Sequence, residues 1–185
     1  MDFAHYWQYT DAVSKTLFFI LILLSMASWV VGILRLLKSR QLANSIAGDL
    51  AGRLKSADKD YSDLEFSQRK TVVEQLLLKN IANYRFELEK GTPVLGTTAA
   101  IAPFIGLFGT VWGIFHALHS IGESGQAGLA QVAGPVGEAL IMTGLGLAVA
   151  IPAVVFFNII ARINRRAIHI ANDTAHQLLA ENARQ

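Results

Sequence analysis

The strongest constraint in this sequence is the spacing of its charged residues, which leaves three long stretches almost free of charge. Residues 16–34 form a run of 19 without a charge, residues 91–122 form a second run of 32, and residues 124–161 contain a single charge, Glu138. About 20 helical residues, rising 1.5 Å each, cross a hydrocarbon core roughly 30 Å thick. Each stretch is therefore long enough to span a bilayer, and the sequence predicts an all-α protein with three transmembrane helices.

Residues that are absent narrow the function. The chain has no cysteine, which excludes disulfides, thiolate metal sites and cysteine nucleophiles. It has neither a phosphate-binding loop of the Walker type nor a dinucleotide-binding glycine turn. Sixteen Lys and Arg residues against 14 Asp and Glu residues give a net charge of +2, too small an excess to indicate a nucleic-acid partner. We therefore expect no cofactor, no metal and no enzymatic activity, and an energy source outside the chain.

The first apolar run is interpreted as an anchor that is not cleaved. A cleavable signal peptide carries positive charge before its apolar core. Here Asp2 and Asp11 precede the run, whereas Arg35, Lys38 and Arg40 follow it.

Lysine and arginine counts predict the orientation, because positively charged loops stay in the cytoplasm. One such residue precedes residue 16, eleven lie between residues 35 and 90, none lies in the turn around Glu123, and four follow residue 161. The N-terminus and the turn are therefore expected outside, and the central segment and the C-terminus in the cytoplasm. The N-terminus contains an aromatic cluster of Phe3, Tyr6, Trp7 and Tyr9. Such residues are typical of a membrane–water interface, here the one on the outer side. The alternative is a disordered tip.

The predicted segments follow one another along the chain. They are an interfacial N-terminus (1–14), the first transmembrane helix (15–37), a cytoplasmic helical segment (38–92), the second transmembrane helix (93–121), an outer turn (122–130), the third transmembrane helix (131–161) and a cytoplasmic C-terminal helix (162–185). Thr92 before Pro93 has the pattern of a helix N-cap, and Ser62 with Glu65 has the spacing of a capping box.

Three apolar stripes predict that the cytoplasmic helices pack on one another and on neighbouring subunits. The stripes are Leu42, Ile46, Leu50 and Leu54; Phe66, Val73, Leu77, Ile81, Tyr84 and Leu88; and Ile163, Ala167, Ile170, Thr174 and Leu178.

Polar side chains inside the predicted spans are the candidate functional residues. A charge at the bilayer centre costs about 2.5–3.5 kcal/mol and usually marks an ion path, and Glu138 is the one ionisable carboxyl within these runs. Counting inward from the expected outer ends places Glu138 about 10 Å deep, Thr110 about 15 Å and Thr143 about 18 Å. The alternative is that each threonine hydroxyl bonds to its own helix and that Glu138 extends toward the outer face. Glu138 and Thr143 do not share one face, since five residues rotate the side chain by about 140°.

Small residues are dense in the second and third spans and predict close helix packing, within one subunit or in an oligomer. The residues expected to serve it are Gly106, Gly109, Gly113, Gly137, Gly144 and Pro152. His116 and His119 are three residues apart and could bind one metal ion. Because we expect no acidic partner near them, we interpret both as polar residues at the membrane interface.

Three stretches of the second and third spans carry a family resemblance. They are residues 102–114 (APFIGLFGTVWGI), 137–141 (GEALI) and 146–154 (GLAVAIPAV). Together they resemble the ExbB/TolQ/MotA family of ion-driven inner-membrane motors over about residues 96–160, and within it they are most similar to the ExbB branch. Pro135 departs from the pattern of many relatives, because it lies three residues before Glu138 where they have proline four residues before the carboxylate.

The resemblance implies a homopentameric helical barrel in the bacterial inner membrane, with the single-span helices of an ExbD-like dimer at its centre. Protons entering from the periplasm would be carried by an aspartate of that partner, in a pathway lined by Thr110, Glu138 and Thr143. Each elementary charge crossing 100 mV releases about 2.3 kcal/mol, which TonB would transmit to the import of iron siderophores and similar cargo. At other family positions, we expect Trp112 to fill a helix contact and Asn158 to cap the inner end of the third span.

Three other functions stay open at this point. One is a TolQ-type motor for cell-envelope maintenance, which shares much of the same sequence core. Another is an ion channel without a partner, in which Glu138 and the histidine pair form the path. The third is a passive scaffold whose glycines only pack helices. The choice between proton and sodium is open as well.

Overall fold

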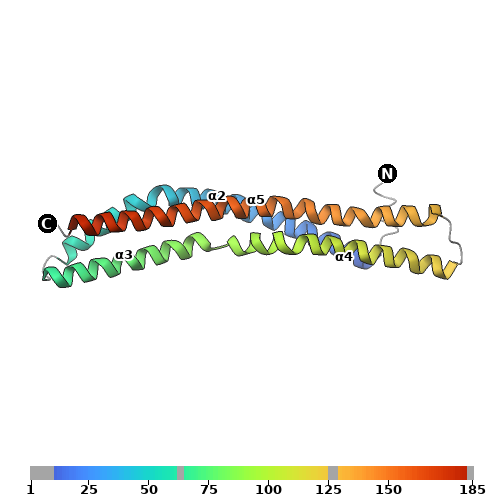
Figure 1. Cartoon of the computed structure of the whole chain (residues 1–185), viewed down its shortest axis with the longest axis horizontal. Coiled ribbons are helices and arrows are strands. Elements are labelled where there is room, and N and C mark those ends of the chain that lie inside the picture. The colour runs from blue at the N-terminus through green and yellow to red at the C-terminus, as the bar shows by residue number, and fades with distance from the viewer. Residues whose placement is uncertain (1–10, 62–64, 125–128, 183–185) are drawn as a thin grey trace. The chain divides into compact units, whose positions relative to one another are not determined.

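The computed structural model describes residues 11–61, 65–124 and 129–182, which form four helices without a β-strand (Figure 1). The helices are α2 (Ala12–Asp60), α3 (Phe66–Glu89), α4 (Thr92–Ser124) and α5 (Leu129–Asn182). The predicted all-α class is therefore confirmed. The aromatic cluster at the N-terminus and Ser62 of the expected capping box lie outside the described residues.

Three helical stretches are long and apolar enough to cross a membrane among the residues that the structure describes. They are Ala12–Ser56, Gln68–Glu123 and Gly134–Ala180. Large apolar side chains on them face outward, including Leu23 (61% exposed), Phe104 (69%) and Ile151 (62%). In water this exposure would be unfavourable, whereas lipid or neighbouring subunits can cover it.

The helices contribute to two compact units. The apolar unit comprises Met1–Gly32 and Val94–Phe157, and the extension unit comprises Ile33–Pro93 and Asn158–Gln185. α2 has no proline in its 49 residues and runs from one unit into the other. α5 does the same over 54 residues, although Pro135 and Pro152 lie inside it and each removes one backbone hydrogen bond.

The core of the extension unit confirms most of the predicted stripes. Ile46 and Leu50 of α2 are fully buried, and Val73 and Leu77 of α3 are 1% exposed. The stripe expected on α5 is partly wrong, because Ile170 is 36% exposed. Ala167 of the same stripe is fully buried, as predicted. Ala171 and Ala175 take the place of Ile170 in the core, and their small side chains let α5 approach the other two helices.

The end of α3 is held by polar contacts that the sequence patterns did not indicate. Buried Asn164 of α5 donates its amide to the carbonyl of Leu88 at 2.7 Å. Gly91 follows with a φ of +72°, which favours glycine and ends the helix. The guanidinium of Arg35 packs against Gly91 and donates to the carbonyl of Glu87 at 3.4 Å. These carbonyls would otherwise lack helical partners.

Three expected caps differ from the structure. The helix α4 begins at Thr92 itself, whose buried hydroxyl has no protein partner among the described residues. Glu65 occupies the N-cap of α3 without a side-chain cap bond. Asn158 caps nothing, because α5 continues through it for another 24 residues. Capping patterns of this kind are short and common, so they indicate helix starts only weakly.

Replacing Asn164 with alanine is expected to destabilise the extension unit by about 1–3 kcal/mol, because the carbonyl of Leu88 loses its buried donor. The thermal unfolding temperature of the purified protein in detergent measures this. Asn83→Ala removes the same amide from an exposed position of α3 and should change little. Equal unfolding temperatures for the two variants would contradict the assigned role.

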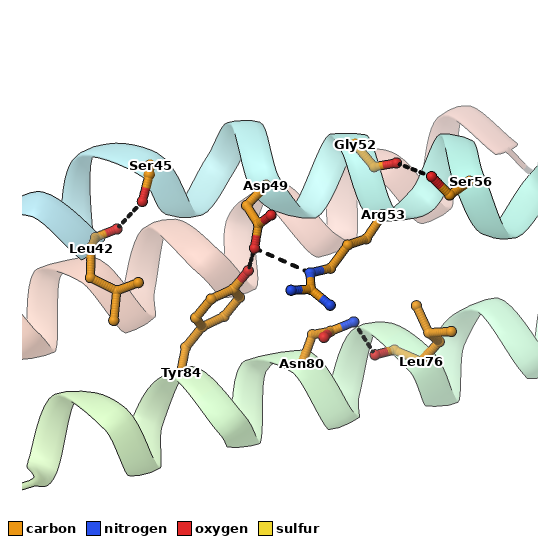
Figure 2. A network of polar contacts seen from close by, with 9 residues as sticks. All are labelled: Leu42, Ser45, Asp49, Gly52, Arg53, Ser56, Leu76, Asn80 and Tyr84. Carbon is orange, nitrogen blue, oxygen red and sulfur yellow. Dashed lines mark hydrogen bonds and ion pairs between the residues drawn. The ribbon is translucent and has the colours of Figure 1, made fainter.

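A polar network joins α2 to α3 beside this core (Figure 2). The hydroxyl of Tyr84 donates to Oδ2 of Asp49, and Nε of Arg53 donates to the same oxygen at 3.1 Å. Hydrogen bonds from Tyr84 and then Arg53 hold the pKa of Asp49 below its ordinary value. Burial, and then the bond to Asp49, raises the pKa of Tyr84. Because Arg53 and Asp49 are about half exposed, their ion pair adds little, and the tyrosine contact matters more.

Tyr84→Phe is expected to lower stability by about 1 kcal/mol at neutral pH. The pKa of Asp49 is lower in the folded protein than its ordinary value of 3.8. Its contribution is therefore fully present above about pH 3.8 and is lost as the pH falls through the folded pKa. The difference in unfolding temperature between Tyr84→Phe and the native protein should thus shrink in acid. Tyr61→Phe is the control, since that hydroxyl has no partner among the described residues. A difference that is independent of pH would contradict the assignment.

Candidate functional site

The candidate site lies where α4 and α5 pack against each other in the apolar unit. A Cβ atom on Gly106 would lie 2.6 Å from the carbonyl oxygen of Met142, and one on Gly146 would lie 2.6 Å from that of Ala102. Real Cβ atoms do not approach backbone oxygens so closely. Only glycine at both positions allows the two backbones to touch, as small residues do in membrane helix pairs.

The contact continues toward the C-terminal end of α4. A Cβ atom on Gly109 would meet the side chain of Met142 at 2.9 Å, and one on Gly113 would meet Cβ of Ala139 at 2.8 Å. At Gly137 and Gly144 a Cβ atom would meet no described atom within 4 Å. These two glycines therefore make no close helix contact among the described residues. Their predicted packing role stays a prediction for contacts with another subunit. Pro152 is half-buried inside α5, and its predicted role likewise stays a prediction.

The close backbone approach brings Thr110 of α4 and Thr143 of α5 together. Oγ1 of Thr143 donates to Oγ1 of Thr110 at 3.3 Å, with a longer contact of 3.5 Å to the carbonyl of Gly106. Oγ1 of Thr110 donates to the carbonyl of Leu107 in its own helix at 2.6 Å. The two hydroxyls therefore form a short directed chain from α5 to α4. The alternative in which each threonine bonds to its own helix describes Thr110 but not Thr143.

The position of this pair can be compared with the start of α2. Nε1 of Trp112 donates to Oδ2 of Asp11 at 2.5 Å, so the start of α2 lies beside Trp112. The helix α4 continues for 12 residues beyond Trp112 to Ser124, about 18 Å. Thr110 precedes Trp112 by two residues, about 3 Å along α4, so the pair lies close to the start of α2. The depth of the pair in a bilayer stays a prediction.

Asp11 fixes the start of α2 in two ways. Its carboxylate accepts the backbone N–H of Ser14 at 3.1 Å, which is an N-cap contact, and it accepts the indole N–H of Trp112. Burial acts to raise the pKa of Asp11, but the hydrogen bonds from Ser14 and Trp112 outweigh it and hold the pKa below its ordinary value. Trp112 thus makes a specific polar contact in addition to the packing expected for it.

The remaining candidate residues are Glu138, His116 and His119. The backbone of Glu138 belongs to α5, but its side chain lies outside the described residues. His116 and His119 are exposed, and Nδ1 of His119 lies 3.7 Å from Oε2 of Glu123. The expectation that His119 has no acidic neighbour is therefore wrong. The spacing of four residues along the helix was the signal for this pair.

Comparison with known proteins places these helices in a family. A model of the "MotA/TolQ/ExbB proton channel family" matches residues 30–172, well over half of the chain. The chain belongs to this family. The match includes both faces of the α4–α5 contact and both threonines, and it extends into the cytoplasmic parts predicted from the positive charges.

Individual relatives agree with this membership. A "Biopolymer transport protein ExbB" of Neisseria meningitidis is 33% identical over 91% of this chain and 91% of its own length. One of Salmonella typhimurium is 33% identical over 96% of this chain and 85% of its own length. One of Xanthomonas campestris is 46% identical over 62% of this chain, and that match spans only 45% of the relative. The resemblance to the ExbB branch is therefore confirmed, and the chain is a multi-pass membrane protein of the MotA/TolQ/ExbB family.

Sequence reasoning missed two polar contacts of this fold. Asp11 was counted only as a charge before the first span, yet it joins α2 to α4 through Trp112. Asn164 was not singled out either. Its place on the same helix face as Ala167 and Ala171 could have indicated that it is buried, but not which group it binds. Contacts between residues so far apart in sequence leave no periodic pattern, so the structure alone identifies them.

Gly146→Ala is expected to destabilise the apolar unit by about 1–3 kcal/mol or more, because the added methyl group forces α5 away from the carbonyl of Ala102. Gly134→Ala is the matched control in the same helix, since its methyl group would meet no described atom within 4 Å. The measurement is thermal unfolding in detergent, monitored by circular dichroism. A native unfolding temperature for Gly146→Ala would show that the close contact is dispensable.

Proposed function

We propose that this chain is the ExbB-type subunit of a motor that uses the proton motive force to energise TonB-dependent import of iron siderophores and similar cargo. In this proposal it forms a homopentamer, and the single-span helices of an ExbD-like dimer occupy the centre. Its N-terminus faces the periplasm and its C-terminus the cytoplasm. The observation that carries the proposal is the hydroxyl chain from Thr143 to Thr110 within a membrane-spanning helix pair.

The chemistry of this chain suits a partner whose carboxyl group changes protonation. The proton of Thr110 is directed to the carbonyl of Leu107, so this hydroxyl is fixed in its orientation. Thr143 is half-buried and bonds to α4 through longer contacts of 3.3 and 3.5 Å, so it can reorient more easily. A threonine hydroxyl donates to an ionised carboxylate and accepts from a protonated one. Thr143 can therefore hydrogen-bond to the partner's carboxyl group in both states.

Glu138 is proposed as the outer member of the pathway. It precedes Thr143 by five residues in α5, about 7.5 Å along the helix axis toward the outer end. An intramembrane carboxyl is unfavourable unless it serves an ion path or pairs with another group. The threonine pair also lies close to the start of α2, which the proposed orientation puts on the periplasmic side. This arrangement supports entry of protons from the periplasmic side over a short distance.

The comparisons favour this proposal over its alternatives. The relatives described above are named for ExbB and not for TolQ, which supports the TonB branch. A family described as a proton channel favours conduction over a passive scaffold and protons over sodium.

Thr143→Ala and Glu138→Gln are expected to reduce energised uptake of an iron siderophore at least tenfold in cells that depend on this protein. Alanine removes the hydroxyl that hydrogen-bonds to the partner's carboxyl group, and glutamine cannot take up and release a proton. Uptake of a radiolabelled iron chelate, normalised to membrane levels of the protein, gives the readout. Thr143→Ser keeps the hydroxyl and should retain most of the uptake.

Thr16→Ala is the matched control, because its hydroxyl bonds only to the carbonyl of Ala12 in its own helix. Normal uptake by both loss variants, with normal protein levels, would reject the pathway. Mass spectrometry of the complex purified in mild detergent separates the branches. Recovery of TonB with a single-span partner supports the proposal, and recovery of TolR and TolA instead would move the chain to envelope maintenance.

A further inference from the structure

The extension unit contains a basic groove that the proposed function does not use. It has a volume of about 660 Å³ and lies between α2 and α5. α2 contributes Arg40 and Asn44, and α5 contributes Asn158, Arg162 and Arg166. Residues four apart on a helix lie on one face, so Arg40 with Asn44 forms one polar row and the α5 residues form the other. The two rows line the same cavity.

The positive charge of the groove is not neutralised. Among the described residues, the guanidinium groups of Arg40, Arg162 and Arg166 have no hydrogen-bond or ion-pair partner, and no acidic residue lines the groove. Elsewhere in the same unit, Arg53 pairs with Asp49 and Lys38 pairs with Glu87. Three unpaired cations around one cavity raise its positive potential and attract an anion.

The groove begins where the apolar runs end. Arg162 is the first charge after the run at residues 124–161, and Arg40 follows the end of the first run by six residues, about 9 Å along the helix. Asn158 and Ile159, at the end of the groove nearer to these runs, still belong to the third apolar run. Ile163 and Ile170 add apolar surface to its lining. Phosphate groups of membrane lipids lie at this level of a bilayer.

We propose that this groove binds the headgroup of an anionic phospholipid. The phosphate lies between Arg40 and the pair Arg162 and Arg166, because guanidinium groups bind phosphate oxygens through two parallel hydrogen bonds. The amides of Asn44 and Asn158 donate to the remaining ester and glycerol oxygens. Ile159 contacts the first methylene groups of the acyl chains, because it lies on the side of Arg162 that faces the apolar run. A bound lipid thereby joins α2 to α5 where both helices leave the membrane.

Phosphate chemistry is shared by lipid headgroups and by free phosphate in the cytoplasm. The groove combines arginines with apolar side chains and lies at the end of two apolar runs. Both features favour a lipid. Free phosphate would gain nothing from the apolar lining. The inference concerns lipid binding and is independent of proton conduction, so either can fail without the other.

The test is native mass spectrometry of the full-length protein, purified as its complex, during titration with phosphatidylglycerol or with phosphatidylcholine of the same acyl chains. The native protein is expected to bind phosphatidylglycerol more tightly. The double variant R162Q/R166Q should lower that affinity about tenfold, as the loss of charge-assisted hydrogen bonds predicts, and reduce the preference over phosphatidylcholine, whose choline group offsets the charge of its phosphate. R162K/R166K keeps the charge and should retain an intermediate affinity.

The control is R85Q/R165Q, which removes the same charge from two exposed arginines outside the groove and should change the affinity less than about twofold. R166Q alone, with a native unfolding temperature, serves if the double variant misfolds. Equal losses in the groove variant and its control would overturn the proposal. So would the absence of a preference for phosphatidylglycerol, or its displacement by millimolar inorganic phosphate, which would make the groove a site for the free anion.

Discussion

The backbone contact between α4 and α5 at Gly106 and Gly146 is the constraint on which the candidate site depends. Two helices can approach to this distance only where neither carries a side chain, because a Cβ atom on either glycine would overlap a carbonyl oxygen of the other helix. The same approach brings the hydroxyls of Thr110 and Thr143 within 3.3 Å. In lipid, packing of this kind replaces the hydrophobic effect as the force between helices. The polar pair is therefore a consequence of the glycine contact.

Polar contacts complete the two units where apolar packing does not suffice. In the extension unit, Asn164 satisfies the carbonyl of Leu88 where α3 ends. In the apolar unit, Asp11 holds the start of α2 beside Trp112. Each contact joins a helix end to the middle of another helix, so it fixes where along its neighbour the helix stops. The unpaired arginines of the basic groove are different, because no described group compensates them, which makes them candidates for an external anion.

Much of the fold was predictable because membranes and helices impose strong local rules. Charge-free runs of sufficient length predicted helical spans, and the stripe from Ile46 to Leu54 predicted a buried face that the structure confirms. The α5 stripe was partly wrong, since alanines replaced Ile170 in the core. Periodicity indicates which face is apolar but not how closely the neighbouring helices approach. That distance decides whether large or small side chains are buried.

The sequence by itself determined the class, the helical spans, the family and the residue types from which a proton pathway would be built. These follow from local composition, since hydropathy and charge act residue by residue. Only the tertiary structure decided that Thr143 bonds across to Thr110 and that the pair lies close to the start of α2. It alone revealed the roles of Asp11 and Asn164. The physical reason is that the offset between packed helices depends on contacts between residues 33 to 101 positions apart, which no local pattern encodes.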